Sequence, residues 1–107
     1  MAFNLKQNDT SPSIQTSLLD GNGLPVDISG NLGVTFHMRN SEGTVIINTA
    51  ATVVTPGSGI VRYDWDAADT ATAGTFQAEF EVTYPGGTIE TFPNDGYIRV
   101  EIIDDIT

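Results

Sequence analysis

The stretch IVRYDWDAADTATAGTFQAEFEVTYPGGTIETFP, residues 60–93, decides the fold of this chain. In its middle, from Thr75 to Tyr84, apolar residues alternate one by one with polar and acidic residues. Successive side chains of a strand point to opposite faces, so this pattern predicts a strand with one apolar and one acidic face. Residues 85–87 then form a turn, and Thr88–Phe92 alternates again. The stretch therefore predicts a β-hairpin.

Short alternating segments separated by turn residues continue on both sides of this hairpin. The further strands that we expect are Phe3–Lys6, Ser13–Leu19, Leu32–Arg39, Thr44–Asn48, Thr52–Thr55, Ile60–Trp65 and Tyr97–Ile103. Closely spaced short strands are typical of sandwiches and barrels. We predict an all-β, antiparallel β-sandwich of about seven strands, with no helix beyond one turn near residues 66–72 that Asp66 caps. Its core should contain the inward residues Phe36, Trp65, Phe76, Phe80 and Val100, surrounded by Ile14, Leu18, Val34 and Val61.

Length and charge limit the classes of function. The chain has 107 residues, and we expect residues 1–107 to form a single domain. Its formal net charge is −10, and its four basic residues are scattered along the chain. Because nucleic acids and anionic membranes bind clustered basic side chains, we expect neither as a partner. The sequence has no cysteine, and we expect that its first residues are not a secretion signal; both points favour folding in a reducing cytoplasm.

The chain lacks a recognisable catalytic or metal-binding pattern. His37 is the only histidine, and we expect it on the outward face of a strand as an ordinary surface residue. The pairs and clusters of acids, such as Glu79 with Glu81, fit a solvated sheet face better than a glycosidase cleft. The run from Asp20 begins like a calcium loop, but Leu24 and Pro25 stand where a ligand and a glycine are required. We therefore predict no catalytic residue, no cofactor and no metal, although the loop with Asp64, Asp66 and Asp69 stays open as a weaker calcium candidate.

Four aromatic residues could form a platform on which sugar rings stack: Tyr63, Trp65, Tyr84 and Tyr97. Most of them occupy core-facing positions or strand ends, where large rings fill the interior of a sandwich. We expect core packing. A buried Trp65 favours a scaffold, whereas an exposed pair of coplanar rings favours a sugar-binding module.

Two resemblances make these expectations more specific. Asp69, Gly74 and Phe76 resemble the Asp-x-Gly-x-Tyr corner of immunoglobulin domains, with extra residues between Asp69 and Gly74 and with phenylalanine in place of the tyrosine. Phe76 has no hydroxyl group to bond back to the main chain, and the usual cysteines are absent. The resemblance therefore implies immunoglobulin-like architecture but not an antibody domain.

A second resemblance extends over nearly the whole chain. It rests on the order and spacing of residues 3–12 (FNLKQNDTSP), 19–30 (LDGNGLPVDISG), 34–39 (VTFHMR), 59–65 (GIVRYDW), 69–80 (DTATAGTFQAEF) and 91–93 (TFP). This pattern resembles the N-terminal domain family of tailed-phage baseplate upper proteins. The resemblance implies a non-catalytic structural component of the virion, in the tail, baseplate or capsid surface, assembled in the cytoplasm of the host bacterium.

For such a protein we expect docking on other virion proteins in many copies, as a homo-oligomer or around a ring. The expected docking residues are Phe3, Leu5, Glu101, Asp104 and Asp105. We also expect removal of residues 1–7 to leave the fold largely intact. The alternative function is a carbohydrate-binding module for the host surface.

Overall fold

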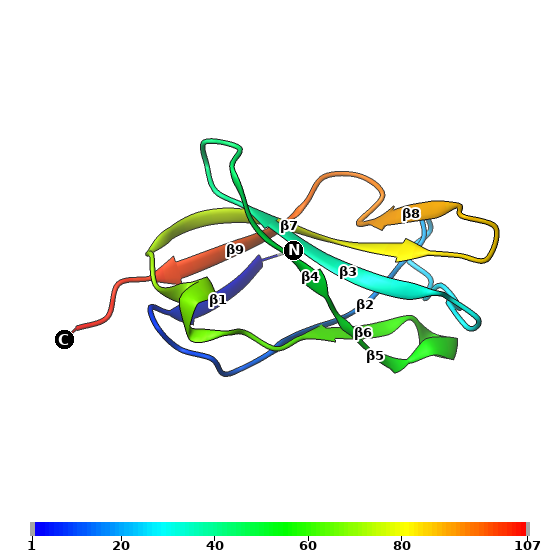
Figure 1. Ribbon diagram of the computed structural model, residues 1–107, viewed down its shortest axis with the longest axis horizontal. Helices are drawn as coiled ribbons and strands as arrows, with labels where there is room; N and C mark the ends of the chain where they lie inside the picture. The colour runs from blue at the N-terminus through cyan, green and yellow to red at the C-terminus, as the bar shows by residue number, and fades with distance from the viewer. Residues whose placement is uncertain (1, 107) are drawn as a thin grey trace.

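The computed structural model describes residues 2–106 and consists of two β-sheets packed face to face (Figure 1). Two short 3-10 helices, η1 (Pro56–Ser58) and η2 (Ala67–Thr70), interrupt the strands. The strands are β1 (Ala2–Lys6), β2 (Ile14–Ser17), β3 (Gly33–Arg39), β4 (Val45–Ala50), β5 (Thr52–Thr55), β6 (Ile60–Tyr63), β7 (Gly74–Thr83), β8 (Ile89–Phe92) and β9 (Ile98–Ile103).

The order of the strands is that of an immunoglobulin-like sandwich. The larger sheet runs β1-β9-β7-β3-β4, with β8 also paired to β7, and the smaller sheet runs β2-β6-β5. In variable-type immunoglobulin domains one sheet contains strands G, F, C and C′ and the other contains B, E and D. Strands β9, β7, β3 and β4 correspond to the first set, and β2, β6 and β5 to the second. The predicted fold class is therefore confirmed.

The larger sheet departs from the expectation in two respects. First, β1 runs parallel to β9, because the chain leaves β1 for the other sheet instead of turning back along β9. Second, there are nine strands in place of about seven. Each of the nine strands overlaps an alternating segment that the sequence predicted, with β4 over Thr44–Asn48 and β8 over Thr88–Phe92, so only the total of about seven was too low.

Strand β8 exists because β7 is long enough for two partners on one side. The first half of β7 pairs with β9, with Ala78 opposite Ile98, and its second half pairs with β8, with Phe80 opposite Phe92. Pro93 follows β8 and has no N–H group, so the ladder of hydrogen bonds stops there. Residues 93–97 then bulge outward before β9 resumes the pairing.

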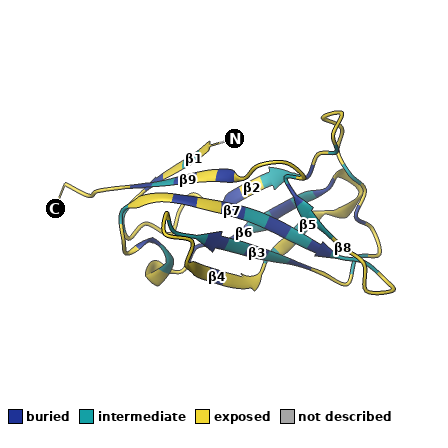
Figure 2. Ribbon diagram, turned by 90° about the horizontal axis from the view of Figure 1, so that it is seen from above, coloured by how far each residue is buried: buried dark blue, intermediate teal, exposed yellow. Residues whose placement is uncertain are grey.

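The core lies between the sheets, and the buried positions alternate along the strands (Figure 2). Phe36 is at its centre, with its ring stacked on Tyr63 at 4.5 Å between centroids and edge-on to Trp65 at 5.7 Å. All predicted core residues are buried: Ile14, Leu18, Val34, Phe36, Val61, Trp65, Phe76, Phe80 and Val100. The predicted inward position of these nine residues is therefore confirmed.

A tyrosine hydroxyl does secure the loop before β7, although it is not at the expected corner position. Tyr63 donates a hydrogen bond of 2.6 Å to the Asp69 carboxylate, which also accepts one of 2.8 Å from the backbone N–H of Asp66. These bonds hold η2, the single turn predicted near residues 66–72. Phe76 packs in the core instead. Burial, followed by the bond to Asp69, raises the pKa of Tyr63 well above its ordinary value.

Candidate docking surfaces

Strand β1 is an open edge of the larger sheet: among residues 2–106 it pairs with β9 alone. The N–H of Gln7 donates to the C=O of Ile103 at 2.8 Å. Because backbone groups alternate in direction along a strand, the amides of Phe3 and Leu5 also face β9, whereas that of Asn4 faces the free edge. The main chain at Asn4 is therefore available to a further strand.

The side chains of β1 contradict the expectation that residues 1–7 can be removed with the fold largely intact. Leu5 is only 5% exposed and belongs to the core, and the Phe3 ring lies 6.0 Å from that of Trp65, centroid to centroid. Both residues point inward because β1 closes one side of the sandwich, so their shared face is the core face. Leu5 and Phe3 thus contribute to the core, and removal of residues 1–7 should not leave the fold intact. Docking by β1 stays a prediction, and it concerns the backbone edge.

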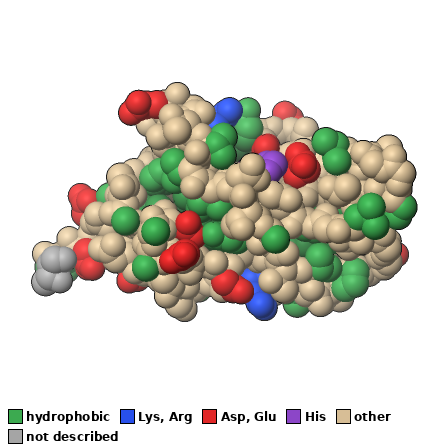
Figure 3. All heavy atoms as spheres, viewed as in Figure 1, with side chains coloured by type: hydrophobic (Ala, Val, Ile, Leu, Met, Phe, Trp, Pro, Cys, Tyr) green, Lys and Arg blue, Asp and Glu red, His purple; other side chains and the backbone are tan. Residues whose placement is uncertain are grey.

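The predicted acidic docking residues differ in whether their carboxylates are bonded to other side chains of the domain. Glu101 lies on β9, where its carboxylate accepts hydrogen bonds from the Thr75 hydroxyl at 3.0 Å and from Nε of Arg99 at 2.6 Å. Asp104 and Asp105 follow β9 and are exposed on a segment that leads away from the sandwich (Figure 1). On the face shown in Figure 3, acidic side chains are spread widely and basic ones are few. Asp105 accepts a hydrogen bond from the backbone N–H of Ile106 at 3.0 Å, and within residues 2–106 neither Asp104 nor Asp105 forms an ion pair, so both negative charges are available to a partner.

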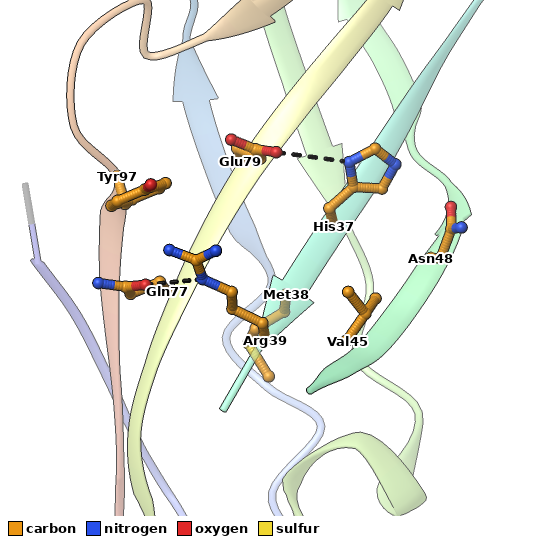
Figure 4. A pocket seen from close by; sticks show the side chains of 8 residues that line it. All are labelled: His37, Met38, Arg39, Val45, Asn48, Gln77, Glu79 and Tyr97. Carbon is orange, nitrogen blue, oxygen red and sulfur yellow. Dashed lines mark hydrogen bonds and ion pairs between the residues drawn. The ribbon is translucent and has the colours of Figure 1, made fainter. Parts of the chain in front are cut away.

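The outer face of the larger sheet has a shallow hollow of about 190 Å³ between β3, β4 and the bulge before β9 (Figure 4). His37 faces outward there, as predicted, with Nδ1 at 3.7 Å from the Glu79 carboxylate. Nε of Arg39 donates to Gln77 at 2.8 Å, and its guanidinium lies 4.7 Å from the centre of the Tyr97 ring. The side chains of His37 and Arg39 therefore interact with others beside them on the same face of the sheet, as cross-strand pairs on a solvated sheet do.

The four aromatic residues do not form a sugar-stacking platform. Trp65 and Tyr63 are 5% and 7% exposed and pack in the core, as expected. Tyr84 is partly buried and donates to Glu90 at 3.0 Å; burial and this bond raise the pKa of Tyr84 to about 12. Tyr97 is well exposed, but its ring is paired with Arg39.

The clustered acids are bonded within the fold. Asp64 accepts hydrogen bonds from the Ser13 hydroxyl at 2.6 Å and from Arg62 at 3.0 Å, which lower the pKa of Asp64. Asp20 accepts from the backbone of Asn22 at 2.8 Å, which is turn chemistry. In the described part of the chain, no three acidic or histidine side chains gather closely enough to hold a metal ion. No helix of that part is long and apolar enough to cross a membrane.

Comparison with known proteins identifies the family of this chain. A family model described as the BppU N-terminal domain, the N-terminal domain of baseplate upper proteins, matches residues 3–93. The chain belongs to this family of phage baseplate domains. The family is a structural one, so this baseplate domain is a structural component of a phage tail and hence of a virion.

Two solved structures share the fold of the baseplate domain. The N-terminal domain of phage TP901-1 ORF48 superposes with a TM-score of 0.62 at 16% identity, over 98% of this chain and 85% of that one. CopC from Methylosinus trichosporium OB3b superposes with a TM-score of 0.55 at 9% identity, over 99% of this chain and 87% of that one. At these identities the likeness shows the fold alone. No curated protein matches the chain in sequence.

One surface of the baseplate domain was not predicted. Residues 43–61, between Glu42 and Arg62, carry no charged side chain and contain both β4 and β5. These strands end the larger and the smaller sheet respectively. The absence of charge was readable in the sequence, but only the strand order shows that the uncharged run lies at two open edges.

Proposed function

We propose that this chain is a non-catalytic adaptor, present in many copies, that joins other proteins of the phage tail through protein–protein contacts. The match of residues 3–93 to a baseplate family carries the proposal. The surroundings of His37 support it, because the described residues that line its hollow include no serine, threonine or cysteine that His37 could activate as a nucleophile. Assembly would take place in the host bacterial cytoplasm, and the partners would be virion proteins, not nucleic acid or membrane.

The proposed docking element is the free edge of β1. A strand of the partner would add beside β1 and bond to the outward amide of Asn4, while its side chains would give specificity. Asp104 and Asp105 would meet a basic surface of the partner. Such exposed charges speed encounter more than they add affinity.

The test compares two substitutions at one position in the intact phage. Asn4→Pro removes the outward N–H without touching the bonds to β9, whereas Asn4→Ala changes only the side chain. Losing one hydrogen bond and introducing the proline ring should weaken docking about tenfold. We expect Asn4→Pro, but not Asn4→Ala, to reduce the amount of this chain in purified particles, as measured by quantitative mass spectrometry. Equal incorporation of both variants would show that β1 is not the docking edge.

The acidic segment is tested separately. Replacing Asp104 and Asp105 by asparagine should slow association with tail proteins at low salt and have little effect at high salt, because salt screens exposed charges over about 8–10 Å. If purified particles lack the chain altogether, and the protein instead binds a host glycan in solution, the adaptor function is wrong and the carbohydrate-binding alternative replaces it.

A further inference from the structure

The uncharged run of residues 43–61 stands out in a chain that carries fourteen acidic and four basic side chains elsewhere. It forms β4, the last strand of the larger sheet, and β5, the last strand of the smaller one. The chain passes from one to the other within a single residue, so the two strands line the same side of the sandwich (Figure 1). We call this surface the β4–β5 edge.

The main chain of β4 is open to a further strand. In the described structure β4 pairs only with β3. The N–H of Ala51 donates to the C=O of Val34 at 2.8 Å, so the alternating groups of Thr49 and Ile47 also face β3. The amides of Asn48 and Ala50 therefore point to the free edge.

Apolar side chains accompany these unpaired amides. Val45, Ile46 and Val54 are 59%, 43% and 40% exposed. Proteins usually block an open edge with a charge or a proline, and neither occurs within β4 or β5. The other edges differ: β1 carries Lys6, β8 carries Glu90, and β2 contributes no large exposed apolar side chain among the described residues.

The charge of the chain indicates which partner fits. A basic partner would be attracted to acidic side chains, and β4 and β5 themselves carry none; the acids next to this edge are Glu42 and Asp69, which line a hollow with Ile46 at one end of β4. A second copy, with its own charge of −10, is repelled by most of the surface and least where both surfaces are uncharged. Antiparallel pairing of β4 with β4 of another copy is also self-complementary, as a two-fold interface requires.

We propose that the β4–β5 edge is a self-association surface, at which two copies of this chain pair β4 with β4 into one continuous sheet. This pairing leaves β1 free, because β1 and β4 are at opposite ends of the larger sheet. The dimer is therefore compatible with docking through β1 but does not depend on it, and either can fail without the other.

Sedimentation equilibrium of the purified chain tests the proposal. The mass should rise with concentration from 11.4 kDa towards twice that value. Raising the salt from about 0.05 M to about 0.5 M should strengthen the dimer, because salt screens the repulsion between acidic copies. Docking between opposite charges would show the reverse dependence. A chain that stays monomeric at about 1 mM in high salt overturns the proposal.

A matched pair of substitutions locates the interface. Ile46→Lys places a charge on the β4–β5 edge of both copies and should raise the dimer Kd at least tenfold. Gln15→Lys makes the same change of charge on β2, also an exposed position of an edge strand, and should change Kd by less than about twofold. Equal weakening by both variants would place the contact elsewhere. Hydrogen exchange gives a second readout: the amides of Asn48 and Ala50 should exchange more slowly in the dimer, and unchanged rates would contradict strand pairing.

Discussion

Truncation of Leu5 tests whether β1 is part of the folded core or an attached arm. Leu5 is 5% exposed, and Leu→Ala substitutions at buried sites cost about 2–5 kcal/mol of unfolding free energy. Strand β1 is at an edge and can shift to fill part of the cavity, so we expect Leu5→Ala to cost about 2–3 kcal/mol. The total unfolding free energy of a domain of this size is about 5–15 kcal/mol, so this loss is a large part of it.

Urea denaturation followed by fluorescence measures this cost. Trp65 is the only tryptophan, and its burial means that unfolding should shift its emission strongly. With a urea dependence of about 2 kcal/mol per M, Leu5→Ala should lower the unfolding midpoint by about 1–1.5 M. Asn4→Ala is the matched control on the same strand, because Asn4 is exposed, and it should cost less than about 0.5 kcal/mol. Similar midpoints for the two variants would refute the placement of Leu5 in the core.

Three further predictions follow from the core and the loops. Phe80→Ala should cost about 3–5 kcal/mol, because Phe80 is fully buried; a loss near zero in the same denaturation assay would mean that the strand faces are inverted. Tyr63→Phe should cost about 0.5–1.5 kcal/mol at neutral pH by removing the bond to Asp69. The pKa of Tyr63 is raised in the folded state, so the stability that its hydroxyl group contributes is complete below about pH 10 and declines above it. The difference in unfolding free energy between wild type and Tyr63→Phe should therefore become smaller above about pH 10, and a constant difference would contradict this. Ser13→Ala should raise the pKa of Asp64 towards its ordinary value, since the bond from Ser13 is the main cause of the lowering. Acidification through this range should therefore reduce the unfolding free energy of the variant less than that of the wild type. An unchanged titration of the Asp64 carboxyl group, measured by NMR, would show that the bond is not formed in solution.

The alternation of apolar and polar residues predicted the fold class and the core, because it can be recognised within a single strand. The alternation from Phe76 to Val82 assigns an inward and an outward face within one strand, without knowledge of its neighbours. The same reasoning placed His37 outside and Trp65 inside, as the structure has them. The turn at Asp66 was predictable because an aspartate before a short helical turn bonds to nearby backbone amides.

The docking surfaces were less predictable because they depend on which strands are neighbours. Phe3 and Leu5 were correctly expected on a strand, but this strand lies at the edge of a sandwich and still turns one face to the core. Glu101 was expected to be available to a partner, yet its carboxylate is bonded to Arg99 and Thr75 of the same sheet. The bond from Thr75 could not be predicted without the register that places Thr75 opposite Glu101, whereas Arg99 lies two residues before Glu101 on the same strand.

The sequence by itself determined the strands, their faces, the core and the family of this chain. The tertiary structure decided the partners of each strand: β1 parallel to β9, β8 and β9 sharing one side of β7, and β1, β4 and β5 left as open edges. The physical reason is the range of the interactions. Side-chain alternation is set by adjacent residues, whereas pairing joins residues as distant as Ala2 and Arg99, and only the folded chain brings them together.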